Sequence, residues 1–247
     1  MLDLDIEKFW ADDEKAHEDR CFSKAAPQVA MGIRMSQECV FAELGEEGNP
    51  WGHTPVERRI ELNKRYNEKA LKIVGRKLLP EFFQAKEKQF PEYRRIGEVF
   101  GGEYLFDGNS EWLKGNCESP AELEKLLDRI DAMDLRSFIL PPDWENEKKR
   151  LFENYGVKPS LFHGIRGPVT LATSVYGVEN LIFLICDEPD LAKRFSDTIC
   201  KVIISYIDIF IEEAGYTKDN FPHGFSFADD NCCMLTPDMY ELFGYPV

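Results

Sequence analysis

Residues 163–171 read His-Gly-Ile-Arg-Gly-Pro-Val-Thr-Leu, and residues 225–237 read Phe-Ser-Phe-Ala-Asp-Asp-Asn-Cys-Cys-Met-Leu-Thr-Pro. In each stretch a short apolar run typical of a strand leads into polar or turn-forming residues, and a proline then marks the first turn of a helix. Strands that alternate with helices favour an α/β fold with parallel strands. We expect such strands at 29–33, 160–165 and 224–228, because each run is followed by a helix signal.

Helix signals recur along the rest of the chain. Each combines a capping residue or first-turn proline with a later apolar stripe or a terminal glycine. A further strand, in a hairpin, is expected at 103–106 between glycine-containing turns. The expected helices span 55–79, 120–130, 143–155 and 189–214.

Two parts of the chain are expected to differ in character. The first 25 residues are typical of a polar helical extension, which Ile6, Phe9 and Trp10 would dock onto the remainder. Residues 26–247 are then expected to form the main α/β domain.

The chain has 247 residues, and its 30 lysines and arginines against 45 aspartates and glutamates give a formal net charge of −15. Nucleic-acid binding depends on clustered basic residues that neutralise phosphates, so this balance disfavours a nucleic-acid partner. Apolar residues make up 43% of the sequence and aromatic residues 13%, as in a folded globular protein. We therefore expect a small-molecule partner.

The sequence also bears on location. No apolar run reaches the roughly 18 to 20 residues that a membrane helix needs, and the acidic start lacks the order of a signal peptide. The seven cysteines are scattered, odd in number and without a Cys-x-x-Cys pair, as is typical of a reduced compartment. The sequence predicts a cytoplasmic protein that is neither membrane-bound nor secreted.

Charged residues at strand ends are the candidates for chemistry. Asp229 and Asp230 directly follow an apolar strand, where acids act as bases, bind a cation or orient a substrate donor. The alternative is that one of them caps the following helix or turn. Arg34 and Arg166 each follow an expected strand and would attract an anionic group of the substrate. For each arginine, the alternative is a surface pair with a neighbouring acid.

Histidines and cysteines give no metal-binding pattern. The histidines at 17, 53, 163 and 223 lack the spacing of metal ligands, and His163 is either a core residue or a substrate-binding residue. Cys232 and Cys233 are expected to be buried thiols, because adjacent cysteines rarely hold one ion together. The sequence therefore supports no complete zinc site.

The turn Gly-Pro-Val-Thr-Leu at 167–171 is similar to the Gly-x-Pro-x-Thr-Leu element of the uroporphyrinogen decarboxylase superfamily, which includes the corrinoid-dependent methyltransferases. Residues 227–247 resemble its later signature, with Leu-Thr-Pro at 235–237 and Phe-Gly-Tyr-Pro at 243–246. The resemblance implies a (β/α)8 TIM barrel with its site in the mouth. Asp229 and Asp230, at the end of the later strand, are the catalytic candidates.

Three positions depart from the decarboxylases. Ser174 stands where they have a tyrosine, and the nearest tyrosine is Tyr176; both remain substrate-binding candidates. Asp230 replaces a neutral hydroxyl residue, and Arg34 supplies one arginine where two are expected. These changes remove positive charge and add a negative charge, which disfavours uroporphyrinogen as the substrate.

The printed sequence ends within the later signature, where the family continues. The zinc-binding residues of the methyltransferases and the late histidine of the decarboxylases belong to that later part. Zinc and a corrinoid are therefore expected only in a longer protein. We expect the first part of a barrel, with an unpaired final strand, exposed apolar faces and self-association into a homo-oligomer.

Three functional hypotheses remain. The first is methyl transfer involving a small-molecule substrate and a corrinoid protein or thiol partner. The second is decarboxylation of uroporphyrinogen or another carboxylated compound. The third is a non-catalytic or inactive fragment, because one fold hosts many chemistries.

Overall fold

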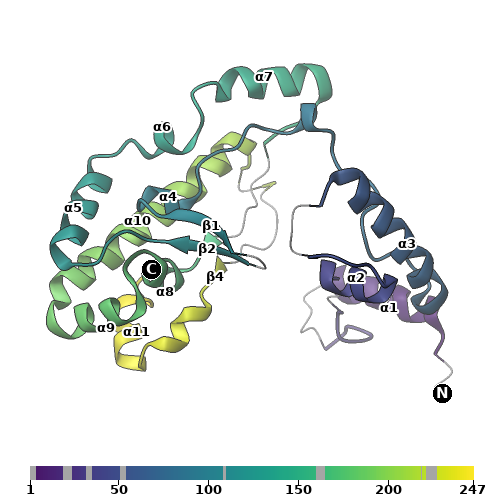
Figure 1. Cartoon of the computed structure of the whole chain (residues 1–247), viewed down its shortest axis with the longest axis horizontal. Coiled ribbons are helices and arrows are strands. Elements are labelled where there is room, and N and C mark those ends of the chain that lie inside the picture. The colour runs from purple at the N-terminus through teal and green to yellow at the C-terminus, as the bar shows by residue number, and fades with distance from the viewer. Residues whose placement is uncertain are drawn as a thin grey trace. The chain divides into compact units, whose positions relative to one another are not determined.

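A computed structural model of the chain describes residues 4–18, 24–31, 35–50, 54–107, 110–159, 165–217, 219–220 and 227–247 (Figure 1). The structure is mixed α/β and mostly helical, with 62% helix and few strands. The chain divides into two compact units, Met1–Gln84 with Gly108–Ser110 and Ala85–Asp107 with Glu111–Val247. The boundary expected at residue 25 falls inside the first unit.

In the first unit, α1 docks against the C-terminal end of α3. The indole Nε1 of Trp10 donates a hydrogen bond to the Val74 carbonyl at 2.5 Å. The Arg76 guanidinium lies 3.5 Å from the centre of the same indole ring. This confirms the expected docking through Trp10. The helices of this unit are α1 (Ile6–Glu18), α2 (Gln37–Leu44) and α3 (Val56–Val74).

α3 begins where the Thr-Pro pair predicts, but it ends at Val74, earlier than the expected end at Leu79. Gly75 follows in the left-handed region at φ 73°, a conformation that closes many helices. A Cβ at Gly75 would lie 2.7 Å from a methyl carbon of Ile6, so α1 also packs closely over this glycine.

The prediction of a strand at 29–33 is wrong for residues 29–31. These are the residues of that segment that the structure describes, and they have no regular structure. Asp13 of α1 explains this, because its buried Oδ1 accepts hydrogen bonds from the Met31 amide at 2.8 Å and from Gln28 Nε2 at 3.3 Å. Val29 is 79% exposed. The segment is therefore bound to a helix instead of a sheet.

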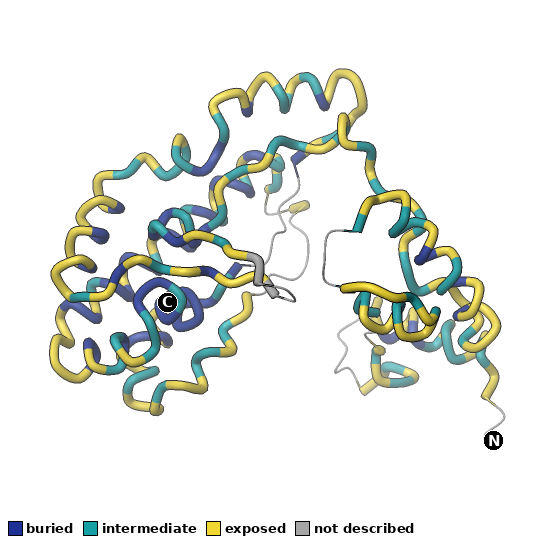
Figure 2. The backbone as a smooth tube through the Cα atoms, in the orientation of Figure 1, coloured by how far each residue is buried: buried dark blue, intermediate teal, exposed yellow. Residues whose placement is uncertain are grey.

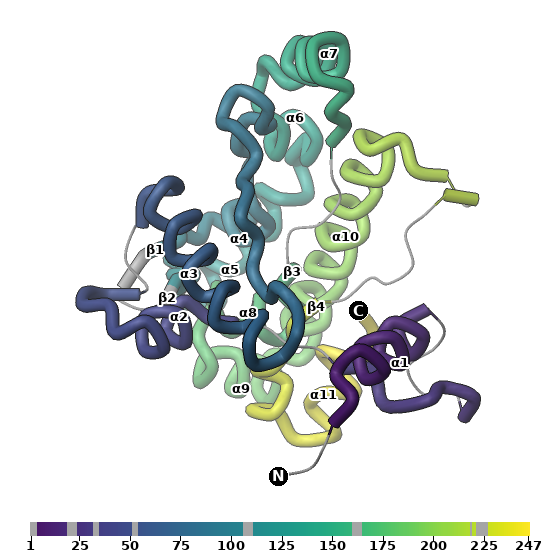
Figure 3. The backbone as a smooth tube through the Cα atoms, turned by 90° about the vertical axis from the view of Figure 1, so that its right-hand side faces the viewer, coloured from purple at the N-terminus to yellow at the C-terminus, as the bar shows by residue number. Residues whose placement is uncertain are grey.

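The second unit is built around α10, its longest helix, which crosses the unit in Figure 3. It contacts α4, α5, α6, α8, α9 and α11. The elements of this unit are η1 (Lys86–Lys88), α4 (Ile96–Val99), β1 (Glu103–Asp107), β2 (Ser110–Lys114), α5 (Pro120–Asp131), α6 (Leu135–Ile139), α7 (Trp144–Tyr155), β3 (Ile165–Arg166), α8 (Pro168–Tyr176), α9 (Val178–Asp187), α10 (Pro189–Ala214), β4 (Phe227–Ala228), η2 (Asp230–Met234) and α11 (Pro237–Phe243).

The predicted helices of this unit are confirmed. α5 starts where the Ser119 hydroxyl accepts a hydrogen bond from the Glu122 amide, and its apolar stripe is buried. α7 ends before Gly156 at φ 65°, and α10 ends before Gly215 at φ 68°. Both glycines adopt the left-handed conformation that closes a helix.

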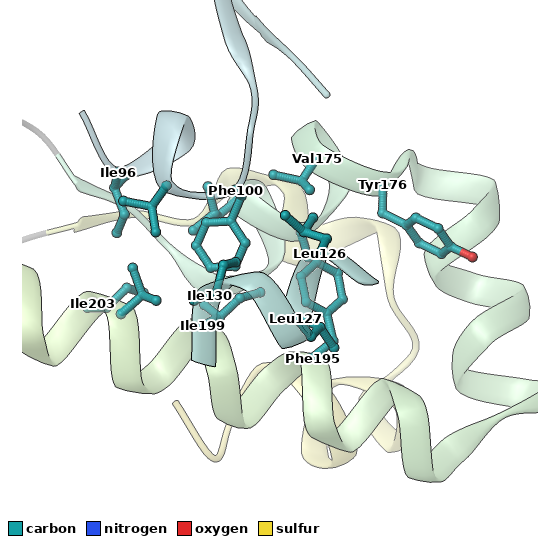
Figure 4. Packing of buried hydrophobic residues seen from close by; sticks show 14 of the residues in the cluster. Ile96, Phe100, Leu126, Leu127, Ile130, Val175, Tyr176, Phe195, Ile199 and Ile203 are labelled. Atoms are coloured by element: carbon teal, nitrogen blue, oxygen red, sulfur yellow. The ribbon is translucent and has the colours of Figure 1, made fainter. Parts of the chain in front are cut away.

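Aromatic rings form the centre of the core. Phe195 of α10 is fully buried, and its ring packs edge-on with Phe100 at 6.3 Å, Tyr176 at 6.4 Å and Phe243 at 5.7 Å between ring centres. Figure 4 shows Phe195 beside Leu126 and Leu127 of α5, in the same cluster as Phe100. α8 packs into the same core and is buried along most of its length (Figure 2).

The described strands form two two-stranded sheets, β1 with β2 and β3 with β4. The strand expected at 103–106 is confirmed as β1, and a two-residue connection joins it to β2, as in an antiparallel hairpin. These described strands do not show a (β/α)8 barrel.

Among the described residues, no single helix is long and apolar enough to cross a membrane. α8 and α9 would meet the length and composition criteria together, but they bend by 103° at their junction.

A buried carboxylate links α6, α7 and the end of α10. The Glu213 side chain is 1% exposed and accepts hydrogen bonds from Trp144 Nε1 at 2.6 Å, Lys148 Nζ at 2.7 Å and Arg136 Nη2. Burial alone would raise the pKa of Glu213, but the hydrogen bonds from Lys148 and Trp144 and the nearby positive charges outweigh it and lower that pKa.

Phe195→Ala should lower the free energy of unfolding by about 3–5 kcal/mol, because it leaves a cavity at the centre of the core. The control is Phe183→Ala on α9, where the ring is 63% exposed, and it should change stability by less than about 0.5 kcal/mol. Urea unfolding followed by circular dichroism measures both. Equal effects of the two substitutions would show that Phe195 is not central to packing.

Glu213→Gln should remove a pH-dependent part of the stability. Because the pKa of Glu213 is lowered in the folded state, its charge stabilises the fold above the unfolded pKa, near 4.3. This contribution is lost as the pH falls through the folded pKa. Urea unfolding at pH 7 should therefore show wild type more stable than the variant by about 1–3 kcal/mol, with a smaller difference at pH 4. A difference that is the same at both pH values would contradict the assignment.

Candidate functional site

The two stretches that suggested the fold lie side by side. β3 and β4 pair in parallel, with Ile165 opposite Phe227 and Arg166 opposite Ala228. The Gly167 amide continues the pairing by donating a hydrogen bond to the Ala228 carbonyl at 2.7 Å. Asp229 therefore lies at the carboxyl end of a parallel strand, as predicted.

Asp229 caps the N-terminus of α8. Its Oδ1 accepts a hydrogen bond from the amide of Thr170, in the first turn of α8, at 2.7 Å. A carboxylate there satisfies an otherwise unpaired N–H group and interacts favourably with the helix dipole. A residue of the second stretch thus caps the helix that the first stretch begins, whereas the sequence suggested capping of the following helix or turn.

Gly167 allows the two stretches to approach this closely. A Cβ at position 167 would lie 2.3 Å from Cβ of Asp229 and 2.7 Å from its Oδ1. Any larger residue would push the strand ends apart. The glycine of the turn is therefore required by the contact with Asp229.

Asn231, in η2, forms a second link to α8. Its amide donates to the hydroxyl of Thr170 at 3.2 Å, and its Nδ2 donates to the hydroxyl of Thr173 at 2.8 Å. Sequence reasoning missed Asn231, Thr170 and Thr173, because the local pattern does not show which helix the loop will contact. Together with the cap, these bonds hold the loop after β4 against the first turns of α8.

Arg166 extends along α8 from the end of β3. Its Nη1 donates to the Ser174 hydroxyl at 3.4 Å, and that hydroxyl donates to the Thr170 carbonyl at 2.7 Å. Hydrogen bonding to Arg95 is the main cause of the lowered pKa of Glu111, and the charge of Arg166 contributes to it. Arg166 is half-buried. Its exposure therefore lies between that of an arginine on the surface and that of a residue in the core.

The two acids differ in environment. Asp230 is exposed, whereas Asp229 is half-buried. Oδ2 of Asp229 is buried and has no hydrogen-bond partner among the described residues. Neither acid lines the cavity beside Arg95, the cavity beside Trp112 or the cavity beside Phe152, all formed by described residues.

The remaining predicted site residues that the structure describes do not lie together with Asp229. Ser174 and Tyr176 line a cavity of about 560 Å³ towards the opposite end of α8. Burial raises the pKa of the Tyr176 hydroxyl. Arg34 and His163 lie outside the described residues. The structure thus joins Arg166 with Ser174, and Asp229 with the start of α8.

The expected burial of the adjacent thiols is corrected. Cys233 is exposed and Cys232 is half-buried against the core, because both lie on the short helix η2 at the surface of the unit. Within the described ranges, no three His, Cys, Asp or Glu side chains are grouped so as to hold a metal ion.

Asp229→Ala should lower the free energy of unfolding by about 1–2 kcal/mol, because the N-terminus of α8 loses its cap. Asp229→Asn should recover most of this loss, since an amide oxygen also accepts the Thr170 hydrogen bond. Asp230→Ala is the matched control and should have an effect within about 0.5 kcal/mol. Urea unfolding measures the free energy of unfolding of each variant. A loss in Asp230→Ala as large as that in Asp229→Ala would contradict the capping role of Asp229.

Comparisons of the chain with protein-family models, with curated proteins and with solved structures found no match. The resemblance therefore depends on the sequence motifs at 167–171 and 227–247 alone.

Proposed function

We propose that the chain belongs to the uroporphyrinogen decarboxylase superfamily and takes part in methyl transfer involving a corrinoid or thiol partner. The supporting observation is the hydrogen bond between Asp229 and the Thr170 amide, across the parallel pair β3–β4. It joins the two motifs that carry the resemblance, which stand about 60 residues apart in sequence. In this proposal, β3, α8 and β4 are parts of a (β/α)8 barrel whose site opens at the carboxyl ends of the strands.

The charge at these strand ends favours methyl transfer over decarboxylation. Among the described residues there, Arg166 supplies one positive charge, whereas Asp229 and Asp230 supply two carboxylates. A substrate with several carboxylates would be repelled unless more cations were present. A methyl group carries no charge that the site would have to neutralise.

The described residues do not fit a zinc ion, because they contain no group of three metal-binding side chains. No step is therefore assigned to zinc. A corrinoid partner would supply the methyl group, and the residues of this chain would bind and orient the acceptor. Arg166, half-buried at the end of β3, would attract an anionic part of the acceptor.

Asp230 is the proposed base. Thiolates rather than thiols are nucleophilic, so the acceptor thiol must lose its proton before it attacks the methyl carbon. The exposed carboxylate of Asp230 can take that proton at the rim of the site. The sulfur then bonds to the methyl carbon, and the bond between that carbon and its donor breaks, leaving its electron pair on the donor.

One observation favours the non-catalytic alternative. Oδ1 of Asp229 is already engaged in capping α8, which is a structural role. An α/β domain that holds its strand ends together in this way needs no chemistry at Asp229. The activity assay separates the two possibilities.

The intact chain should accelerate methyl transfer from methylcobalamin to 2-mercaptoethanol, measured by the absorbance change on demethylation. Asp230→Asn should slow the reaction at pH 7 by about 100-fold, the range of a lost general base. The deficit should shrink at pH 10, where the thiol ionises without help. Asp208→Asn, at an exposed position on α10, is the control and should match wild type.

The outcome decides between the hypotheses. No acceleration by the wild-type chain would contradict methyl transfer. Release of carbon dioxide from uroporphyrinogen by the same protein would favour the decarboxylase alternative. A deficit of Asp230→Asn that does not change with pH would contradict the role of Asp230 as a base.

A further inference from the structure

A cavity of about 560 Å³ lies between the β1–β2 hairpin and the C-terminal end of α8. Its volume is within the range of about 300–1,000 Å³ that is typical of small-molecule sites. It adjoins the last turn of α8, whereas the Asp229 cap is at the first turn. Its lining does not include Arg166, Asp229 or Asp230, so a ligand site here does not depend on methyl transfer.

An exposed indole forms one wall of the cavity. On β2, Leu113 is 7% exposed and packs in the core, whereas the neighbouring Trp112 is 62% exposed. Successive strand residues point to opposite faces, so Trp112 lies on the face away from the core. Leu105 of β1, 38% exposed, lines the cavity beside it. A large exposed aromatic surface next to a cavity offers a platform on which a flat ring can stack.

The inner wall is largely apolar. Cys117, Val175 and Tyr176 line it and are at most 6% exposed. Burial raises the pKa of the Cys117 thiol to about 11, so this side chain stays protonated at neutral pH and acts as an apolar surface rather than a nucleophile.

Three polar side chains of the wall, those of Thr173, Ser174 and Asn180, already have hydrogen-bond partners. The Thr173 hydroxyl donates to the Val169 carbonyl at 2.9 Å, and the Ser174 hydroxyl donates to the Thr170 carbonyl at 2.7 Å. Asn180 Nδ2 donates to the Tyr176 carbonyl at 2.9 Å. A ligand can therefore fill the cavity without having to satisfy these groups.

Charge at the rim is balanced. The lining includes Lys114 and Glu118, both exposed and of opposite sign. Since these charges offset each other, the cavity presents no net charge that would attract an ion. The walls and rim therefore suit an uncharged molecule.

We propose that this cavity binds an uncharged, planar aromatic compound that stacks on Trp112 and is covered by Val175 and Tyr176. No covalent step is involved, because the Cys117 thiol is buried and protonated.

The test is titration of the intact chain with N-phenyl-1-naphthylamine, an uncharged aromatic probe whose fluorescence rises in an apolar site. Saturable binding of one probe per chain is expected, with affinity about 10-fold weaker in Trp112→Ala and close to wild type in Trp112→Phe. Phe183→Ala removes an equally exposed ring from α9, outside this cavity, and should leave affinity unchanged.

Two further measurements sharpen the result. Leu105→Trp should block the cavity and abolish binding, which keeps the proposal testable if Trp112→Ala fails to fold. A related probe that carries a sulfonate, 1-anilinonaphthalene-8-sulfonate, should bind at least 10-fold more weakly. Undiminished binding in Trp112→Ala, an equal loss in Phe183→Ala, or equal affinity for the sulfonate would overturn the proposal.

The test is independent of the proposed activity. Trp112→Ala should keep the methyl-transfer rate of wild type, since Trp112 lies on β2 and the cavity that it lines does not include Arg166, Asp229 or Asp230. If methyl transfer is not observed at all, probe binding and its dependence on Trp112 still decide whether this cavity is a ligand site.

Discussion

The hydrogen bond from the Thr170 amide to Asp229 holds together the part of the molecule on which the functional proposal depends. It joins a helix start to a strand end about 60 residues later, and it occurs where β3 and β4 are paired for only two residues each. Such short strands contribute few ladder hydrogen bonds, so the carboxylate and the Asn231 bonds supply much of the attachment. This contact requires glycine at position 167, because a side chain there would collide with Asp229 and keep the two strand ends apart.

α10 gives this junction a rigid support. Its buried stripe places Phe195 against the ring of Phe100, which directly follows α4, and against rings from α8 and α11, so the helix that Asp229 caps is packed on one side and capped at its end. The opposite end of α10 is tied to α6 and α7 through the buried Glu213. The same core positions the last turn of α8 next to the hairpin, where the cavity beside Trp112 lies. One helix therefore connects the proposed reaction site with the proposed ligand site.

Helix positions could be predicted from sequence far better than contacts between segments. The bounds of α5, α7 and α10 depend on local signals, such as Ser119-Pro120 and the glycines at 156 and 215, and the structure confirms them. The prediction of a strand at 29–33 is wrong for residues 29–31, because the Met31 amide donates its hydrogen bond to the buried Asp13, 18 residues earlier in the chain. Asp229 could be placed at a strand end, but no local pattern shows that its partner is the Thr170 amide. The exposure of Trp112 also escaped sequence reasoning, since alternation along β2 does not reveal which face meets the core.

The cap across the β3–β4 junction also has a consequence for synthesis of the chain. The ribosome synthesises the chain from its N-terminus, so Pro168–Tyr176 emerges well before Asp229 is present to accept the hydrogen bond from the Thr170 amide. Until then the first turn of α8 lacks its carboxylate and β3 lacks its partner strand. Closing a loop of this length adds an entropic cost that local helices do not bear. Residues 227–231 can therefore dock onto α8 only after that helix, α9 and α10 have all been synthesised.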